Sequence, residues 1–88
     1  MKVKFTETGW ADYLHWQNHD KKILKRINRL IDDIERNGYD GIGKPEGLKH
    51  RHSGWWSRRI DEENRLVYRL TEGGAAMEIT QCKGHYDD

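Results

Sequence analysis

The sequence predicts an α+β domain in which two N-terminal α-helices pack on one face of a small, antiparallel-rich β-sheet. Three observations lead to this fold class. An apolar stripe with helical spacing runs through residues 23–34, the apolar period changes towards two after Leu48, and turn-forming residues divide the remaining chain into short strands. With 88 residues the chain has the length of one small domain, so residues 1–88 are expected to form a single unit.

The first strand and the first helix are expected before residue 20. Residues 3–5 (VKF) are typical of a short strand, and either Thr6 or Thr8 can accept a backbone N–H and begin a helix. In the helix that follows, four residues fall at helical spacing: Trp10, Tyr13, Leu14 and Gln17. The two tryptophans of this region, Trp10 and Trp16, are expected to anchor the core or an interface.

The second helix carries the clearest periodic signal in the sequence. Asp20 is a plausible N-cap, and its negative charge suits a helix N-terminus. Asn37-Gly38 ends the helix. Apolar residues recur at positions i, i+4, i+7, i+8 and i+11 and form one stripe: Ile23, Ile27, Leu30, Ile31 and Ile34.

The remaining elements are strands separated by turns. The glycine-rich residues 38–47 are expected to be a loop, and 61–63 and 72–74 are expected to be hairpin turns. Within 64–70, alternation directs Leu66, Tyr68 and Leu70 towards the helices and Arg65, Val67 and Arg69 towards the open face or a groove. The strand candidates are 48–52 with 55–60, then 64–71, then 76–83.

Composition indicates a local anion site more than a general DNA-coating protein. The net charge is only +1, yet residues 44–69 carry seven Lys or Arg against four Asp or Glu. One cysteine, Cys82, cannot form an intrachain disulfide, and neither a signal peptide nor a membrane-spanning stretch is recognisable. A cytoplasmic protein without a membrane partner is the resulting expectation.

The residues also contain the groups that metal-free RNA cleavage requires. A base removes the proton of the ribose 2′-OH, a cation stabilises the charge that develops at phosphorus, and an acid protonates the departing 5′-oxygen. Glu46, Arg65 and His85 can fill these roles, with Lys49, Arg59 and Tyr86 as helpers. Many charged domains hold such residues, so composition alone does not select this set.

Several sequence motifs single out this set of residues. The stretches GKPEGLKH, SGWWSRRI and ENRLVYRL, together with the late HY pair, resemble the Txe/YoeB family of bacterial toxins in the RelE/ParE superfamily. The likeness extends over nearly the whole chain, including DYLHWQ and KRINRLIDDI. It implies a microbial-ribonuclease-like (RelE-like) sheet with two N-terminal helices, and the activity of a ribosome-dependent mRNA endonuclease. It also implies neutralisation by a cognate antitoxin of the YefM/Axe kind.

The resemblance assigns a role to each matching residue. Glu46 is implied as the general base, Arg65 as the phosphate stabiliser, His85 as the general acid and Tyr86 as a residue that orients the substrate or the leaving group. No metal and no cofactor is implied. The residues implied to contact substrate or phosphate are Lys49, His50 and Arg59.

The same residues have plainer interpretations. Glu46 could be a solvated loop carboxylate, Arg65 could pair with the carboxylate of Glu62 or Glu63, and a histidine near a C-terminus is most often incidental. A metal-like set also exists, although its spacing matches no common structural zinc site. Its members are His50, His52, Cys82 and His85.

Trp55 and Trp56 alternate along a strand and therefore cannot share a face. One is expected under the sheet or at a dimer contact, and the other is expected to stack on an RNA base. The sequence does not decide which is which.

Two competing functions remain open alongside the endonuclease. One is a non-catalytic toxin of the ParE type, which binds and inhibits a protein, and the other is a plain RNA-binding module. The expected partners are the antitoxin, the ribosome with its mRNA, and a second copy of the chain in a homodimer, the last because of the surplus of aromatic residues.

Overall fold

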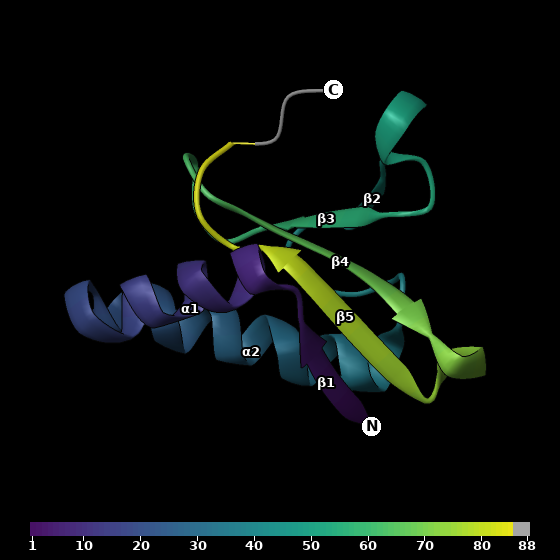
Figure 1. Ribbon diagram of the computed structural model, residues 1–88, viewed down its shortest axis with the longest axis horizontal. Helices are drawn as coiled ribbons and strands as arrows, with labels where there is room; N and C mark the ends of the chain where they lie inside the picture. The colour runs from purple at the N-terminus through teal and green to yellow at the C-terminus, as the bar shows by residue number, and fades with distance from the viewer. Residues whose placement is uncertain (86–88) are drawn as a thin grey trace.

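The computed structural model describes residues 1–85 and confirms the α+β architecture. Both helices lie on one side of a five-stranded sheet with the strand order β1-β5-β4-β3-β2, as Figure 1 shows. The β1–β5 pair is parallel and the other three pairs are antiparallel. The strands are β1 (Lys2–Phe5), β2 (Glu46–Gly47), β3 (Trp56–Arg59), β4 (Arg65–Thr71) and β5 (Ala76–Gln81), and the helices are α1 (Glu7–His19) and α2 (Lys21–Asn37).

Side-chain caps set the bounds of both helices. Thr6 accepts the backbone N–H of Gly9 and begins α1. Asp20 ends α1 by donating its own N–H to the Trp16 carbonyl, and its carboxylate begins α2 by accepting two backbone N–H groups. Gly38 ends α2 with φ 64°, a conformation that glycine adopts readily. Neither helix has the length and apolar character needed to cross a membrane.

The core lies between the helices and the sheet. The predicted stripe of α2 supplies Ile27, Leu30 and Ile34, all completely buried. They belong to one cluster with strand residues Leu66, Tyr68, Met77 and Ile79. Full burial of such a side chain contributes about 1.5–3 kcal/mol, so this cluster is the main source of stability.

The backbone of α1 approaches β5 closely at Gly9. A Cβ atom on this residue would lie 2.3 Å from the carbonyl oxygen of Ile79, which is shorter than any van der Waals contact allows. Glycine is therefore required here for its size, since α1 could not otherwise pack this near the strand.

Alternation in β4 follows the prediction with one refinement. Leu66 and Tyr68 are buried against the helices, while Arg65 and Arg69 face the opposite side. Val67 alternates with Leu66 and Tyr68, yet only 2% of it is exposed, and it contributes to the lining of a cavity.

The predicted strand at 48–52 is wrong. The strand that pairs with β3 is only Glu46–Gly47, and His50–His52 forms a short 3-10 helix (η1). The last bond of this hairpin joins the Leu48 N–H to the Trp55 carbonyl. Because Leu48 already bonds to Trp55, residues 49–54 have to form the connection between the two strands, so the chain turns there instead of continuing as a strand.

The last strand is shorter than predicted and ends at Gln81. The backbone N–H of Cys82 donates to the carboxylate of Asp12 on α1 and not to a neighbouring strand. From there the chain turns at Gly84, with φ 89°, towards the start of β4. This turn sets the position of His85.

Candidate active site

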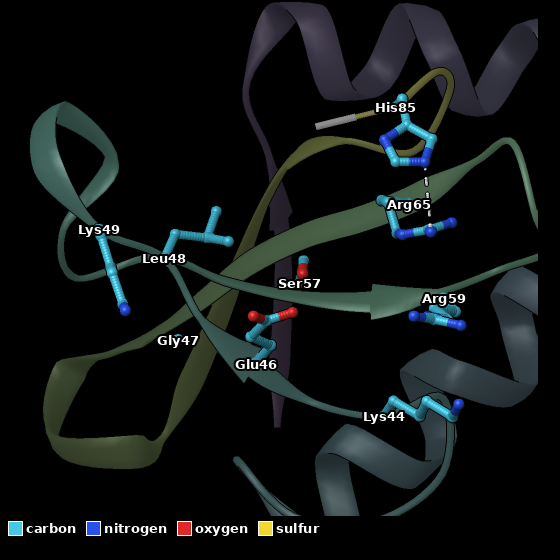
Figure 2. A pocket seen from close by; sticks show the side chains of 9 residues that line it. All are labelled: Lys44, Glu46, Gly47, Leu48, Lys49, Ser57, Arg59, Arg65 and His85. Carbon is cyan, nitrogen blue, oxygen red and sulfur yellow. Dashed lines mark hydrogen bonds between the residues drawn. The ribbon is translucent and has the colours of Figure 1, made fainter. Parts of the chain in front are cut away.

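A cavity of about 330 Å³ opens on the face of the sheet that the helices leave uncovered. Glu46 reaches it from β2, Arg65 from the start of β4, and His85 from the segment after β5, and Figure 2 shows the three side chains around one space. Three residues that are distant in the sequence thus line a single cavity. The full lining is Lys44, Glu46, Gly47, Leu48, Lys49, Ser57, Arg59, Arg65 and His85.

The cavity has a strong excess of positive charge. Its lining carries one carboxylate, that of Glu46, and one imidazole, that of His85. Against these stand four cationic side chains, those of Lys44, Lys49, Arg59 and Arg65. A concave site with this composition attracts an anion such as a phosphodiester, whereas the nearly neutral chain as a whole does not.

Backbone pairing in β2 fixes the position of Glu46. Glu46 lies opposite Ser57 in the antiparallel pair with β3, so both side chains are on the cavity side. The residue is exposed, which leaves its carboxylate accessible to a ligand. Lys44, two residues earlier, has φ 51°, an uncommon value for a residue with a side chain.

Arg58 holds the segment that leads into Lys44 and Glu46. Its side chain is completely buried on the helix side of β3. The guanidinium forms an ion pair with Asp33 of α2, and its Nε donates to the Tyr68 hydroxyl at 3.1 Å. It also donates to three carbonyl oxygens of the loop after α2, those of Gly38, Asp40 and Ile42.

This arrangement satisfies a buried charge and ties three elements together. The hydrogen bond from Arg58 is the main reason that the pKa of Asp33 lies below its usual value, and the backbone N–H of Ile42 lowers it further. The Asp33 carboxylate is therefore ionised at neutral pH. Next to this pair, the N–H of Arg59 donates to the Gly43 carbonyl at 2.7 Å, which extends the anchoring almost to Lys44.

Arg65 is held by backbone oxygens. Its Nη1 donates to the carbonyls of Asp61 at 2.7 Å and Asn64 at 3.1 Å, with a longer contact to the Glu62 carbonyl at 3.4 Å. Its Nη2 lies 3.3 Å from Nε2 of His85. The pairing with the carboxylate of Glu62 or Glu63 that the sequence left open does not occur, so the charge of the guanidinium is not neutralised by these groups.

A small hydrogen-bond network places His85 beside Arg65. The carboxamide oxygen of Asn64 accepts the N–H of Gly84 at 2.7 Å, and the N–H of Arg65 donates to the Gly84 carbonyl at 3.0 Å. Gln81 donates its side-chain N–H groups to the carbonyls of Gly84 and His85. Asn64 is itself buried and donates to the carboxylate of Asp61. The strand start and the chain after β5 are thereby joined at one point.

The structure brings together some of the other predicted site residues. Lys49 and Arg59 line the cavity, whereas His50 belongs to η1 and is not part of its lining. Tyr86 lies outside the described residues 1–85.

The two adjacent tryptophans are on opposite faces of the sheet, as alternation predicts. Trp56 packs against the core and stacks on Tyr39 with ring centroids 4.4 Å apart. Trp55 faces the open side, with the guanidinium of Arg69 4.4 Å above its ring. Trp55 is therefore the tryptophan that a ligand on the open face can reach.

The metal-like set of histidines and cysteine is not assembled. Cys82 is completely buried, and burial, followed by the charge of Asp12, raises the pKa of its thiol to about 12. A thiol with such a pKa is a poor zinc ligand, because zinc binds the thiolate. Within residues 1–85, no three His, Cys, Asp or Glu side chains are grouped as metal ligands would be.

Sequence reasoning missed two residues that support the site. Arg58 had a detectable signal, because it alternates with Trp56 and Ile60, two apolar residues that face the helices. A charged residue on the core side of a strand indicates a buried partner. Asn64 had no such signal, since its role depends on Gly84, which is twenty residues away.

Comparisons with known proteins show the family and the fold of the chain. A model of the family described as the YoeB-like toxin of bacterial type II toxin-antitoxin systems matches residues 5–86. Toxin YoeB of Streptomyces coelicolor is 52% identical over 86 residues, which cover 98% of this chain and all of that protein. The YoeB/ParE toxin from Agrobacterium tumefaciens superimposes with a TM-score of 0.94 at 44% identity, over 98% of this chain and 100% of that one.

Two solved structures from Staphylococcus aureus are also similar. One is a YoeB-YefM complex, with a TM-score of 0.89 and 42% identity. The other is a YoeB dimer, with a TM-score of 0.89 and 44% identity. Each match covers 98% of this chain and 98% of the other.

Proposed function

Because the chain belongs to the family of YoeB-like toxins of bacterial type II toxin–antitoxin systems, we propose that it is a ribosome-dependent mRNA endonuclease that inhibits translation. The observation that carries the proposal is the convergence of Glu46, Arg65 and His85 on one cationic cavity. These are the base, the cation and the acid that cleavage of RNA without a metal requires.

In the proposed reaction, the carboxylate of Glu46 removes the proton from the ribose 2′-OH. The 2′-oxygen then forms a bond to the adjacent phosphorus, and the bond from phosphorus to the 5′-oxygen breaks. His85 gives a proton to that leaving oxygen, so the products are a 2′,3′-cyclic phosphate, which can open to a 3′-phosphate, and a 5′-hydroxyl. The proposed reaction is metal-independent: every proton and charge is handled by side chains of the protein.

Arg65 has the stabilising role in this proposal. Negative charge grows on the non-bridging phosphate oxygens in the transition state, and a fixed guanidinium near them lowers its energy. The three backbone carbonyls that hold Nη1 support this role, because they orient the group before the substrate arrives. Lys49 and Arg59 are proposed to hold the flanking phosphates, and Tyr86 to orient the substrate.

The ribosome is proposed to supply the alignment of the substrate. The cavity is small and open, and it offers limited grip on a flexible RNA strand. An mRNA that is held in the decoding site can present its 2′-OH in line with the leaving oxygen, which provides the positional part of catalysis. A modest acid–base set then suffices.

The proposed protein partners are a YefM-like antitoxin and a second copy of the chain. Support comes from the similar Staphylococcus aureus structures, of which one is a YoeB-YefM complex and another is a YoeB dimer. The cationic cavity suits capture by an acidic segment that folds on binding and covers the site.

The test is cleavage of a defined mRNA by purified toxin and translating ribosomes in the presence of a chelator. Cuts within codons are expected, and Glu46→Ala, Arg65→Ala or His85→Ala should abolish or sharply reduce them. An Arg65→Ala protein that keeps full toxicity would favour the ParE-like alternative, in which a protein target is bound. Strong salt-dependent RNA binding without any product would favour the plain RNA-binding module.

A further inference from the structure

A second cavity of about 500 Å³ lies along β4 and β5, and the N-terminal part of α1 also borders it through Thr8 and Asp12. Its lining combines one tryptophan and the nearly buried Val67 with several polar and charged side chains. No role in the chemistry proposed above involves this cavity. Its lining is Thr8, Asp12, His52, Trp55, Val67, Thr80, Gln81 and Lys83.

The two cavities are neighbours in the sheet. Val67, which lines the second cavity, pairs across the strands with Ser57, which lines the first. Val67 also follows Arg65 by two positions on the same face of β4, a span of about 7 Å along an antiparallel strand. A phosphate held at Arg65 would therefore carry its nucleoside to the edge of the second cavity.

Gln81 links the cavities directly. It lines the second cavity, and its side-chain nitrogen donates to the carbonyls of Gly84 and His85. A group that enters the second cavity thus lies against the residue that supports the His85 segment.

The tryptophan of this lining is already oriented to receive a planar group. One face of Trp55 is covered by the guanidinium of Arg69, which is itself paired with Glu78 at 2.8 Å. This cation–π contact fixes the indole before any ligand binds. Trp56 is not available for the same purpose, because it stacks on Tyr39 on the other side of the sheet.

The polar side chains of the lining suit the edge of a nucleobase. Gln81 adds an amide oxygen and Lys83 adds a charged amine, and neither group has a partner among the described residues. The Asp12 carboxylate accepts the Cys82 N–H through one oxygen, which leaves its other oxygen as an acceptor. Nucleobases present donors and acceptors at their edges and an apolar face above and below, and this cavity matches both.

We propose that the second cavity receives the base of one of the two nucleotides that flank the phosphate at Arg65, with the base against Trp55. This inference rests on the proposed function, because it takes the first cavity as the phosphate site. The proposed occupant is RNA and not a segment of a partner protein, because the two cavities together match the base and the phosphate of a single nucleotide.

NMR titration with a dinucleotide tests the proposal. The probe is ApA with a 2′-O-methyl group at the linkage, which blocks cleavage, and two matched probes lack either the first or the second base. The protein has four tryptophans, and the indole N–H signals of two of them are assigned with Trp55→Phe and Trp10→Phe. Trp10 is exposed and does not line either cavity, so its signal serves as the internal control.

The expected result is a shift of the Trp55 signal with intact ApA that is lost with one of the two abasic probes, while Trp10 does not move. Trp55→Ala should weaken binding of ApA by at least about fivefold, the lower end for a base–aromatic stack. Trp55→Ala should bind the abasic probe that fails to shift Trp55 as tightly as the wild type does. That probe lacks the base that contacts Trp55, so the substitution removes no further contact. Circular dichroism checks that the variant is folded.

Two results overturn the inference in distinguishable ways. Shifts at the backbone amides of Arg65 and His85 without a base-dependent shift at Trp55 would retain the phosphate site and overturn the base site. The absence of a Trp55 shift at any ApA concentration up to the millimolar range would overturn the base site alone, because the proposed function is tested separately by ribosome-dependent cleavage.

Discussion

Nη2 of Arg65 lies 3.3 Å from Nε2 of His85, although the two residues are separated by twenty positions in the sequence. Arg65 begins β4 and His85 follows β5, and the Asn64–Gly84 hydrogen bond joins these two segments. The contact places a permanent cation beside an imidazole in a cavity that Glu46 also lines. This geometry leads to predictions about Arg65 itself and about the residues that hold it.

Replacing Arg65 with lysine should reduce ribosome-dependent cleavage by about two orders of magnitude, the cost typical of losing one aligned donor to the transition state. A lysine keeps the charge, but a single ammonium cannot bind the turn carbonyls and reach His85 at the same time. Single-turnover cleavage of a defined mRNA measures the effect. Arg51→Lys, an exposed arginine outside the cavity lining, is the matched control and should change the rate less than twofold.

Replacing Asn64 with alanine should lower kcat while changing KM little, because the side chain positions His85 without touching the substrate. The variant leaves the Gly84 N–H without its acceptor, and loss of a buried partner of this kind also destabilises the fold by about 1–3 kcal/mol. Initial rates at several mRNA–ribosome concentrations separate the two parameters, with activity normalised to folded protein. A selective rise of KM with unchanged kcat would contradict the positioning role.

Breaking the Arg58–Asp33 pair should destabilise the protein strongly. Arg58→Met leaves Asp33 and three carbonyls without their donor, and removal of one partner of a buried pair costs about 3–5 kcal/mol. Urea unfolding at pH 7 measures the loss. The exposed substitution Arg51→Met controls for the change of residue type and should leave the midpoint nearly unchanged.

The same pair predicts how stability depends on pH. The pKa of Asp33 is lower in the folded protein than its usual value near 4, so its ion pair stabilises the fold fully above pH about 4 and loses this effect as the pH falls through the folded pKa. Asp33→Asn should therefore be less stable than wild type at pH 7. The difference should shrink steadily below pH 4 in a series of urea titrations, and a constant difference down to pH 2 would refute the assignment.

Cys82 should react very slowly with iodoacetamide in the native protein. Its thiol is completely buried and has a pKa of about 12, so the reactive thiolate is scarce and inaccessible at pH 8. Labelling followed by mass spectrometry should show at least a hundredfold slower modification than in urea-unfolded protein, where the thiol has its ordinary pKa of about 8.5. Rapid native labelling would show that the region where α1 meets β5 opens easily.

The features that could be predicted from the sequence depend on neighbours along the chain. The cap at Asp20 and the stripe from Ile23 to Ile34 follow from spacing within one helix, and the structure confirms both. Alternation in β4 correctly separated Leu66 and Tyr68 from Arg65. The family resemblance then selected Glu46, Arg65 and His85, which no local pattern could have chosen from so many charged residues.

The features that could not be predicted depend on pairing between distant segments. Residues 48–52 are predicted as a strand from the sequence, but the pairing of Leu48 with Trp55 makes residues 49–54 the connection of the hairpin. The choice between Trp55 and Trp56 required knowing which face the helices cover. The network at Asn64 depends on how the chain turns after β5, and this turn is not encoded near residue 64.

The parallel pairing of β1 with β5 has a consequence for the synthesis of this toxin. Within residues 1–85, the edge strand β1 pairs with β5 alone, so Lys2–Phe5 and the α1 backbone at Gly9 can pack only after residues 76–81 have been made. Contacts of such long sequence separation form late in folding. A nascent chain that lacks residues 76–85 therefore has neither a completed sheet nor the contact between Arg65 and His85.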